Sequence, residues 1–419
     1  EVEEARAEMQ SVLDEVTEAR DIEEITTTAL HLGALSSRRG DDKAALEYFG
    51  VAERTARELG DDIAAAEALS GIGIAHSYLG DVDAALDALE RAIVIAGAHG
   101  DQRNEATWTG NLGMILQAQG DLDGAVERYQ TALAVAREVG DRPNELTFLG
   151  QLGTVSYLRG DYPVARQRLE RALAIAHELD MVNAVAVLNG NLANVDFVQG
   201  AWELADVSYA AAVGAWEQLD NQRSVGLNLG NRGLVAIALG RLDAAEEFVR
   251  RSLAIAEQIG NRRGVGIQQG NLGTIAWRRG DPVSARGHYE TALTIARELD
   301  DPLNEGLVLT NLGRIDLDAG DLVGAAERGR AALERLEAGT PEWIRAIELA
   351  ARVALGRGRV VDAARLVDVA QGERARLSAP PTPVEADEVA ELVASVEGVS
   401  VDALDAAEAT AFAVTTLSV

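Results

Sequence analysis

The sequence contains no cysteine, which excludes disulfide bonds, thiolate metal ligands and thiol nucleophiles. It also lacks a run that approaches the ~18 apolar residues of a membrane span, and it does not open on a signal peptide. Aromatic residues are scarce, with 5 Trp, 7 Tyr and 5 Phe among 419 residues. Much of the apolar material is instead alanine and leucine, which suits close packing of helix on helix.

Basic residues are also in short supply. The 38 Lys+Arg against 68 Asp+Glu leave a net charge of −30, and Lys43 is the only lysine. An acidic surface repels phosphate backbones and anionic lipid, so we expect neither nucleic acid nor a membrane as a partner. We expect a cytoplasmic location, with which the absence of cysteine is compatible. The 47% hydrophobic content excludes a chain that is disordered throughout.

What the sequence does contain is a repeat of 40 residues. Glycine recurs eight times without a slip, from Gly40 to Gly320, and an alanine stands five residues after each of these glycines. A small residue also stands seven positions before each: Gly33, Gly73, Gly113, Gly153, Ala193, Gly233, Gly273 and Gly313. Eight copies in phase predict a repeat architecture.

Glycine-aspartate pairs divide each unit into two helices. Pairs such as Gly40-Asp41 and Gly60-Asp61 fall about every 20 residues over the first four units. Glycine tolerates the left-handed conformation at a helix end, and aspartate caps the next helix. The spacing therefore predicts antiparallel pairs of helices of about 16–18 residues. Their apolar stripes, for example Ala125, Tyr129, Ala132, Leu133 and Ala136, are buried only when pairs stack on their neighbours.

The motif N-L-G-x-I-x-x-x-x-G-D-x-x-x-A-x-x-x-Y-x-x-A-L, at residues 111–133 and 271–293, resembles the tetratricopeptide repeat. Gly113, Ala125, Tyr129 and Ala132 fill the signature positions of that family. The 40-residue period is similar to the Pins/LGN and kinesin-light-chain branch. HEAT repeats share the length but not the Gly-Asp pairs. The resemblance implies an all-α fold, a right-handed α-solenoid of antiparallel helix pairs.

The phase of the repeat predicts the organisation of the chain. Residues 1–20 are expected to be the second helix of a preceding half repeat or an N-terminal cap, so that the sequence starts within an array. Eight repeats should occupy residues 21–337, and a degenerate ninth repeat residues 338–377. Residues 378–419 are expected to form an acidic helical cap. The C-terminal end resembles the close of bacterial STAND-class signalling ATPases, in which a tetratricopeptide array acts as sensor.

No constellation of catalytic residues stands out. The five histidines share no metal-ligand spacing, no glycine-rich stretch is followed by the Lys-Ser/Thr of a phosphate loop, and no acidic pair is distinguished from the rest. We therefore predict that the chain is not an enzyme and has no metal or cofactor.

Three columns of the repeat are candidates for a binding surface. The first is a column of amides at Asn111, Gln151, Asn191, Asn231, Asn271 and Asn311. In tetratricopeptide arrays the first helix of each unit lines the concave groove, where such amides hydrogen-bond a peptide backbone. The alternative is that they only support the helix.

The second column precedes the amides and consists of Gly110, Gly150, Gly190, Gly230 and Gly270. It either admits a partner very close to the groove or lets long helices stack, and we favour stacking. The third column aligns Tyr157, Phe197 and Trp277 with Ile237, as binding aromatics or as core. Arginines at the starts of first helices, such as Arg103 and Arg263, either meet an acidic partner or pair with nearby carboxylates, which we favour.

The sequence thus predicts a scaffold that binds protein or peptide in a concave groove. The favoured setting is the C-terminal sensor module of a larger bacterial signal-transduction ATPase or transcriptional regulator. The alternative is a stand-alone adaptor or peptide receptor.

Overall fold

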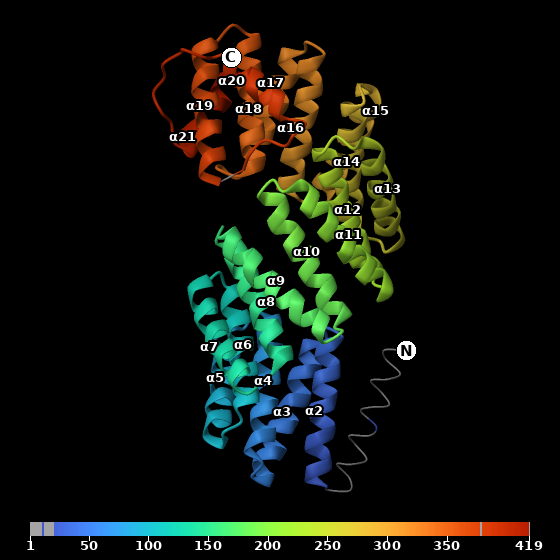
Figure 1. The fold of residues 1–419 in the computed structure, drawn as a ribbon, viewed down its shortest axis with the longest axis vertical. Helices are drawn as coiled ribbons and strands as arrows, with labels where there is room; N and C mark the ends of the chain where they lie inside the picture. The colour runs from blue at the N-terminus through green and yellow to red at the C-terminus, as the bar shows by residue number, and fades with distance from the viewer. Residues whose placement is uncertain (1–10, 12–20, 378, 419) are drawn as a thin grey trace. The chain divides into compact units, whose positions relative to one another are not determined.

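The computed structural model describes residue 11, residues 21–377 and residues 379–418. The helix expected at residues 1–20 lies almost wholly outside the described residues. In the described part of the chain every regular element is an α-helix (Figure 1). The chain divides into two compact units, Glu1–Met181 and Val182–Val419.

Unit 1 contains four helix pairs in which each helix packs against the next. The helices α2, α4, α6 and α8 come first in their pairs, and these first helices also contact one another in sequence. The bounds are α2 Ile22–Arg38, α3 Asp42–Leu59, α4 Asp62–Leu79, α5 Val82–His99, α6 Gln102–Ala118, α7 Leu122–Glu138, α8 Arg142–Leu158 and α9 Tyr162–Glu178.

Unit 2 continues the same pattern of pairs and then adds two helices at its C-terminal end. Its first helices α12, α14, α16 and α18 contact one another in order. The bounds are α10 Val182–Val198, α11 Trp202–Gln218, α12 Gln222–Ala238, α13 Leu242–Gln258, α14 Arg262–Arg278, α15 Pro282–Glu298, α16 Pro302–Asp318, α17 Leu322–Leu333, α18 Pro341–Gly356, α19 Val360–Leu377, α20 Ala386–Ala394 and α21 Ala406–Ser418.

The helix boundaries follow from the predicted capping chemistry. Asp41, for example, accepts a hydrogen bond from the backbone N–H of Ala44, and Gly60 ends α3 with φ of 72°. Asp180, Asp220 and Asp300 adopt the same left-handed conformation with φ near 50°, in place of the glycine found at other joints. The predicted all-α solenoid of antiparallel pairs, with helices of about 17 residues, is confirmed.

The small residues of the repeat stand where two helices of a pair approach most closely. A Cβ added at Gly33 would lie 2.6 Å from the ring of Phe49, and one at Gly273 would lie 2.8 Å from the ring of Tyr289. Since real Cβ atoms do not tolerate such distances, the bulky residue sixteen positions later excludes a side chain at the glycine. The packing reason outweighs the ~1 kcal/mol that glycine costs inside a helix.

The C-terminal part of unit 2 has the largest apolar cluster in the described chain. Trp343 at the start of α18 is fully buried, and its indole Nε1–H donates to Thr410 Oγ1 of α21 at 2.9 Å. Ala409, Ala413 and Leu417 of α21 belong to the same cluster. Helix α21 therefore belongs to the core of this unit.

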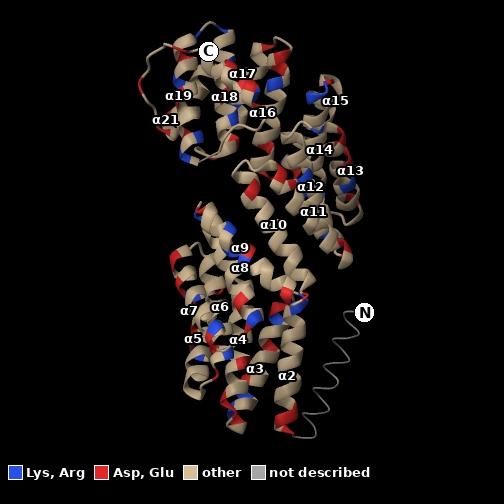
Figure 2. Cartoon of the chain, in the orientation of Figure 1, with Lys and Arg blue, Asp and Glu red and all other residues tan. Residues whose placement is uncertain are grey.

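Acidic residues occur on most helices, with the fewer basic residues interspersed among them (Figure 2). None of the described helices combines the length and apolarity that a membrane crossing requires.

Candidate functional site

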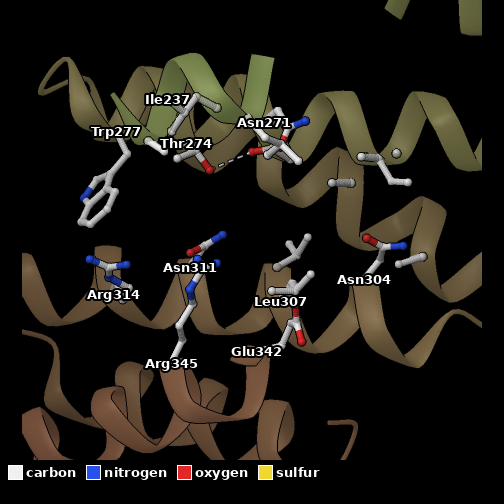
Figure 3. A pocket seen from close by; sticks show the side chains of 18 of the residues that line it. Ile237, Asn271, Thr274, Trp277, Asn304, Leu307, Asn311, Arg314, Glu342 and Arg345 are labelled. Carbon is white, nitrogen blue, oxygen red and sulfur yellow. Dashed lines mark hydrogen bonds between the residues drawn. The ribbon is translucent and has the colours of Figure 1, made fainter. Parts of the chain in front are cut away.

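A cavity of about 350 Å³ opens among the first helices of unit 2. It is lined by α10, α12, α14, α16 and α18, by part of α15, and by the segment that follows α19. Such a volume is within the usual range for a ligand pocket. Figure 3 shows Asn271, Thr274 and Trp277 of α14 on one side, facing Leu307, Asn311 and Arg314 of α16 on the other.

The members of the glycine column differ in what lies beside them, and Gly270 is the one that borders the cavity. Added Cβ atoms at Gly110 and Gly230 would lie 2.1 Å from Phe148 and 2.6 Å from Gln268. These contacts support the stacking interpretation at Gly110 and Gly230. At Gly270, by contrast, no atom lies within 4 Å of the added position, and this glycine lines the cavity.

The polar side chains of the cavity differ in whether they already form hydrogen bonds within the protein. Thr274 donates to the carbonyl of Gly270 at 3.2 Å, and Asn304 donates to Asp301 at 2.7 Å. The amide of Asn311 points into the cavity and has no hydrogen-bond partner among the described residues. A half-buried amide with a free donor and acceptor is suited to a peptide group.

Trp277 closes one end of the cavity in a position fixed by charged groups. Its indole Nε1–H donates to Asp318 at 2.9 Å. The guanidinium carbons of Arg278 and Arg314 lie 4.8 Å and 4.4 Å from its ring centroid, so both cations stack on the indole. These contacts orient the indole beside the cavity, as suits an aromatic contact residue.

The segment after α19 forms another wall of the cavity, through Thr382, Val384 and Glu385. Glu385 lies 3.7 Å from Arg345 and accepts a hydrogen bond from the hydroxyl of Thr382 at 2.8 Å. Burial by itself raises the pKa of Glu385, but the charges of Arg345 and Arg314 and the bonds from Thr382 outweigh it. The resulting pKa is about 2.

This pKa predicts how acid acts on the wall segment. Because the folded pKa of Glu385 lies below the ordinary value of 4.5, ionised Glu385 stabilises the fold above about pH 4.5. That contribution is lost as the pH falls from about 4.5 through about 2. We expect the melting temperature of wild type to be higher than that of Glu385→Gln at neutral pH. The difference between the two melting temperatures should shrink as the pH falls from about 4.5 to about 2. Glu391→Gln, an exposed change in the same segment, should show no such trend; a parallel trend would contradict the assignment.

The structure places the six predicted amides in two kinds of surroundings. Asn271 is buried, and its amide donates to Gln268 at 3.0 Å, so that it supports its own helix. The others are half-buried and have no hydrogen-bond partner among the described residues: Asn111, Gln151, Asn191, Asn231 and Asn311. Of the six, Asn271 and Asn311 line the cavity.

The aromatic column divides similarly. Phe197, Ile237 and Trp277 line the cavity. Phe197 also packs edge-to-face on Trp202 at a centroid distance of 5.0 Å. Tyr157, in unit 1, is half-buried and packs against Tyr162 at 5.8 Å. Burial raises the pKa of Tyr157.

The arginines at the starts of first helices form ion pairs, as favoured from the sequence. Arg103 lies 3.0 Å from Asp141, and Arg263 lies 2.8 Å from Asp301. The pairs join residues about 38 positions apart and so link adjacent repeats. Arg142 and Arg262 instead pair with Glu178 and Glu298 on the second helix of their own repeat, whereas Arg223 makes no ion pair within the described residues.

Sequence reasoning missed Arg314, Arg345 and the wall segment. Arg314 follows Asn311 by one helical turn and therefore lies on the same face, which was a usable signal. The wall segment carried no such signal, because its position depends on how α20 and α21 fold back.

The predictions that this chain binds neither nucleic acid nor a membrane are not tested by this geometry. Among the described residues no group of three metal-ligating side chains is suitably arranged.

The fold and the cavity define the class of protein as an α-solenoid of helix hairpins with a ligand-sized pocket among its first helices. A family model described as tetratricopeptide repeat matches residues 24–96, 104–178, 184–258 and 268–338, more than half of the chain. The chain belongs to the tetratricopeptide repeat family. No curated protein matches it significantly.

Solved structures share the fold at low sequence identity. The apo quorum sensor NprR from B. thuringiensis is 15% identical with a TM-score of 0.59, covering 80% of this chain and 95% of that one. A STAND protein with a tetratricopeptide repeat sensor from Pyrococcus horikoshii is 17% identical with a TM-score of 0.60, covering 70% and 44%. A tetratricopeptide repeat protein from Parabacteroides merdae is 16% identical with a TM-score of 0.51, covering 70% and 98%.

Proposed function

We propose that this chain is a non-enzymatic scaffold that binds a protein or peptide in the cavity between α14 and α16. The observation that carries the proposal is the free amide of Asn311, which points into the cavity near the indole of Trp277. An amide binds peptide groups whatever the side chains, and an aromatic neighbour supplies apolar contact area. Catalytic chemistry is no part of this proposal.

The other predicted amides and aromatics extend the proposed surface. In unit 2, Asn191 and Asn231 stand on α10 and α12 at the positions equivalent to Asn311, and both are half-buried. We propose them as secondary contacts for a longer peptide. In unit 1, Asn111, Gln151 and Tyr157 are proposed as a separate contact surface.

The test uses a peptide selected on the intact protein from a random library, without regard to its charge. We expect Asn311→Ala to weaken binding of that peptide at least ~10-fold, because a hydrogen bond in a partly desolvated site is lost. Asn183→Ala removes an exposed asparagine from the start of α10, away from the cavity, and should leave affinity unchanged. Equal affinity of both variants and wild type would show that the cavity is not the binding site.

For the biological setting we propose the C-terminal sensor or regulatory module of a larger bacterial signal-transduction ATPase or transcriptional regulator, acting in the cytoplasm. The similarity in fold to a quorum sensor and to the sensor of a STAND protein supports a sensing role. We also propose the organisation predicted from the repeat: eight repeats over 21–337, a degenerate ninth over 338–377 and a C-terminal cap.

The alternative is a stand-alone adaptor or peptide receptor, which the fold of NprR equally favours. The native gene upstream of Glu1 separates the two. A reading frame that continues into a strand–GxxxxGK[ST]–helix segment supports the sensor module. A start codon within a few residues refutes it and leaves the adaptor.

A further inference from the structure

Four arginines gather on the first helices of unit 2 beside the cavity, and we call them the arginine patch: Arg278 of α14, Arg314 of α16, and Arg345 and Arg352 of α18. The chain as a whole carries a net charge of −30, so a cluster of four cations on one surface is conspicuous. Arg278 and Arg314 are largely buried, with side chains 17% and 16% exposed. Buried cations of this kind need counter-charges.

The counter-charges come from the chain's own C-terminal segment. Glu388 Oε1 accepts from Arg278 at 2.5 Å, and its second oxygen accepts from Arg314. The carbonyls of Val384 and Glu388 accept from Arg278 and Arg352 at 3.1 Å and 2.7 Å. Glu385 lies 3.7 Å from Arg345. Residues 382–388 thus occupy the patch through two carboxylates and two backbone carbonyls.

Few buried apolar residues connect this segment to the core of the unit. Residues 379–385 form no helix, and Pro380, Pro381 and Pro383 restrict them to extended or turn conformations. The following α20 buries only Val389 and Leu392. By contrast, α21 is anchored in the core beside Trp343. An element with few buried apolar contacts opens at low free-energy cost.

We propose that the arginine patch is a docking site for an acidic, extended segment of a partner protein, and that residues 382–388 occupy it until such a partner displaces them. Charge complementarity decides the chemistry of the partner, since the patch binds carboxylates and carbonyls in this structure. Because Val384 and Glu385 also form a wall of the cavity, displacement enlarges the cavity entrance. The inference deepens the proposed function and rests on it for the link to ligand binding.

Competition between the two occupants has a predictable strength. A segment tethered at both ends acts at an effective concentration of order mM, so it suppresses weak binding of a free peptide. When the ion pairs between residues 382–388 and the arginine patch are weakened, we therefore expect binding of a free peptide that supplies the same carboxylates and carbonyls. A fluorescein-labelled peptide with the sequence of residues 380–391 is the natural probe.

The experiment compares full-length wild type with the double variant Glu385→Gln/Glu388→Gln. These amides keep the side-chain shape and remove both charges that face the patch. The matched control is Glu391→Gln/Glu397→Gln, which removes two exposed charges from the same stretch without touching an arginine within the described residues. Hydrogen exchange of residues 382–394 reports release of the segment, and fluorescence anisotropy reports peptide binding.

We expect the double variant to exchange faster over residues 382–394 and to bind the probe at least ~10-fold more tightly than wild type and the control do. A probe with lysine in place of the residues equivalent to Glu385 and Glu388 should not bind. Unchanged exchange in the double variant would overturn the proposal, because the ion pairs then do not hold the segment. Faster exchange without tighter probe binding would also overturn it, since the vacated patch then has no affinity for acidic peptide.

These failures are separable from failure of the proposed function. The Asn311→Ala comparison uses a peptide selected without regard to charge and does not depend on the arginine patch. A cavity that binds such a peptide, with a patch that ignores the acidic probe, would retain the proposed function and refute this inference alone.

Discussion

Replacing Trp343 by alanine is expected to destabilise the C-terminal part of unit 2 by about 3–5 kcal/mol. The indole is fully buried in the cluster that joins α17, α18, α19 and α21, and its loss leaves a cavity there. It also removes the donor that bonds Thr410 at 2.9 Å. Hydrogen exchange of α18 and α21 measures the local loss, since the repeats of a solenoid need not unfold together.

Trp343→Phe provides the control for this prediction. It keeps most of the apolar volume and removes the hydrogen bond to Thr410, so a loss of about 1 kcal/mol is expected. If both variants behaved like wild type, α21 would not be part of the core. The result matters for function, because α21 anchors the far end of the segment that covers the arginine patch.

Replacing Gly110 by alanine is expected to destabilise α6 and α8 by about 1–3 kcal/mol. The new Cβ would lie 2.1 Å from Cε1 of Phe148, whose buried ring has little room to move. Gly270→Ala changes the equivalent residue four repeats later, 160 positions along the chain, with the opposite expected sign. No atom lies within 4 Å of its added Cβ, so the helix gains up to ~1 kcal/mol from the better propensity of alanine.

Amide hydrogen exchange of the helices on either side of each glycine measures both effects. Loss of stability in both variants would show that the space beside Gly270 is filled, and the cavity assignment would then be wrong. Equal tolerance of both would refute the packing role of Gly110. The pair therefore tests the glycine column and the cavity in one comparison.

Much of the fold could be predicted because its determinants are local and recur. Capping by residues such as Asp41 and the left-handed turn at Gly60 depend on neighbours within one helical turn. The stripe from Ala125 to Ala136 was predicted completely, because a helix of period 3.6 presents those residues on one face. Because the period is strict, the same capping, turn and packing patterns recur along the array.

The candidate site was only partly predictable. The amide column was evident as a pattern, but the pattern did not reveal that Asn271 bonds to Gln268 while Asn311 is free. Likewise the glycine column did not show which member has empty space beside it. These distinctions depend on the residue contributed by the neighbouring repeat, such as Phe148 opposite Gly110.

The sequence by itself determined the class of fold, the family and which residues stand on the first helices of the repeats. All three follow from short-range chemistry repeated every 40 residues. Only the tertiary structure decided where the cavity lies and what covers the arginine patch. Glu388 contacts Arg278 and Arg314 across 110 and 74 positions of sequence. Contacts of that range depend on how the last helices fold back on the array, which no repeat period specifies.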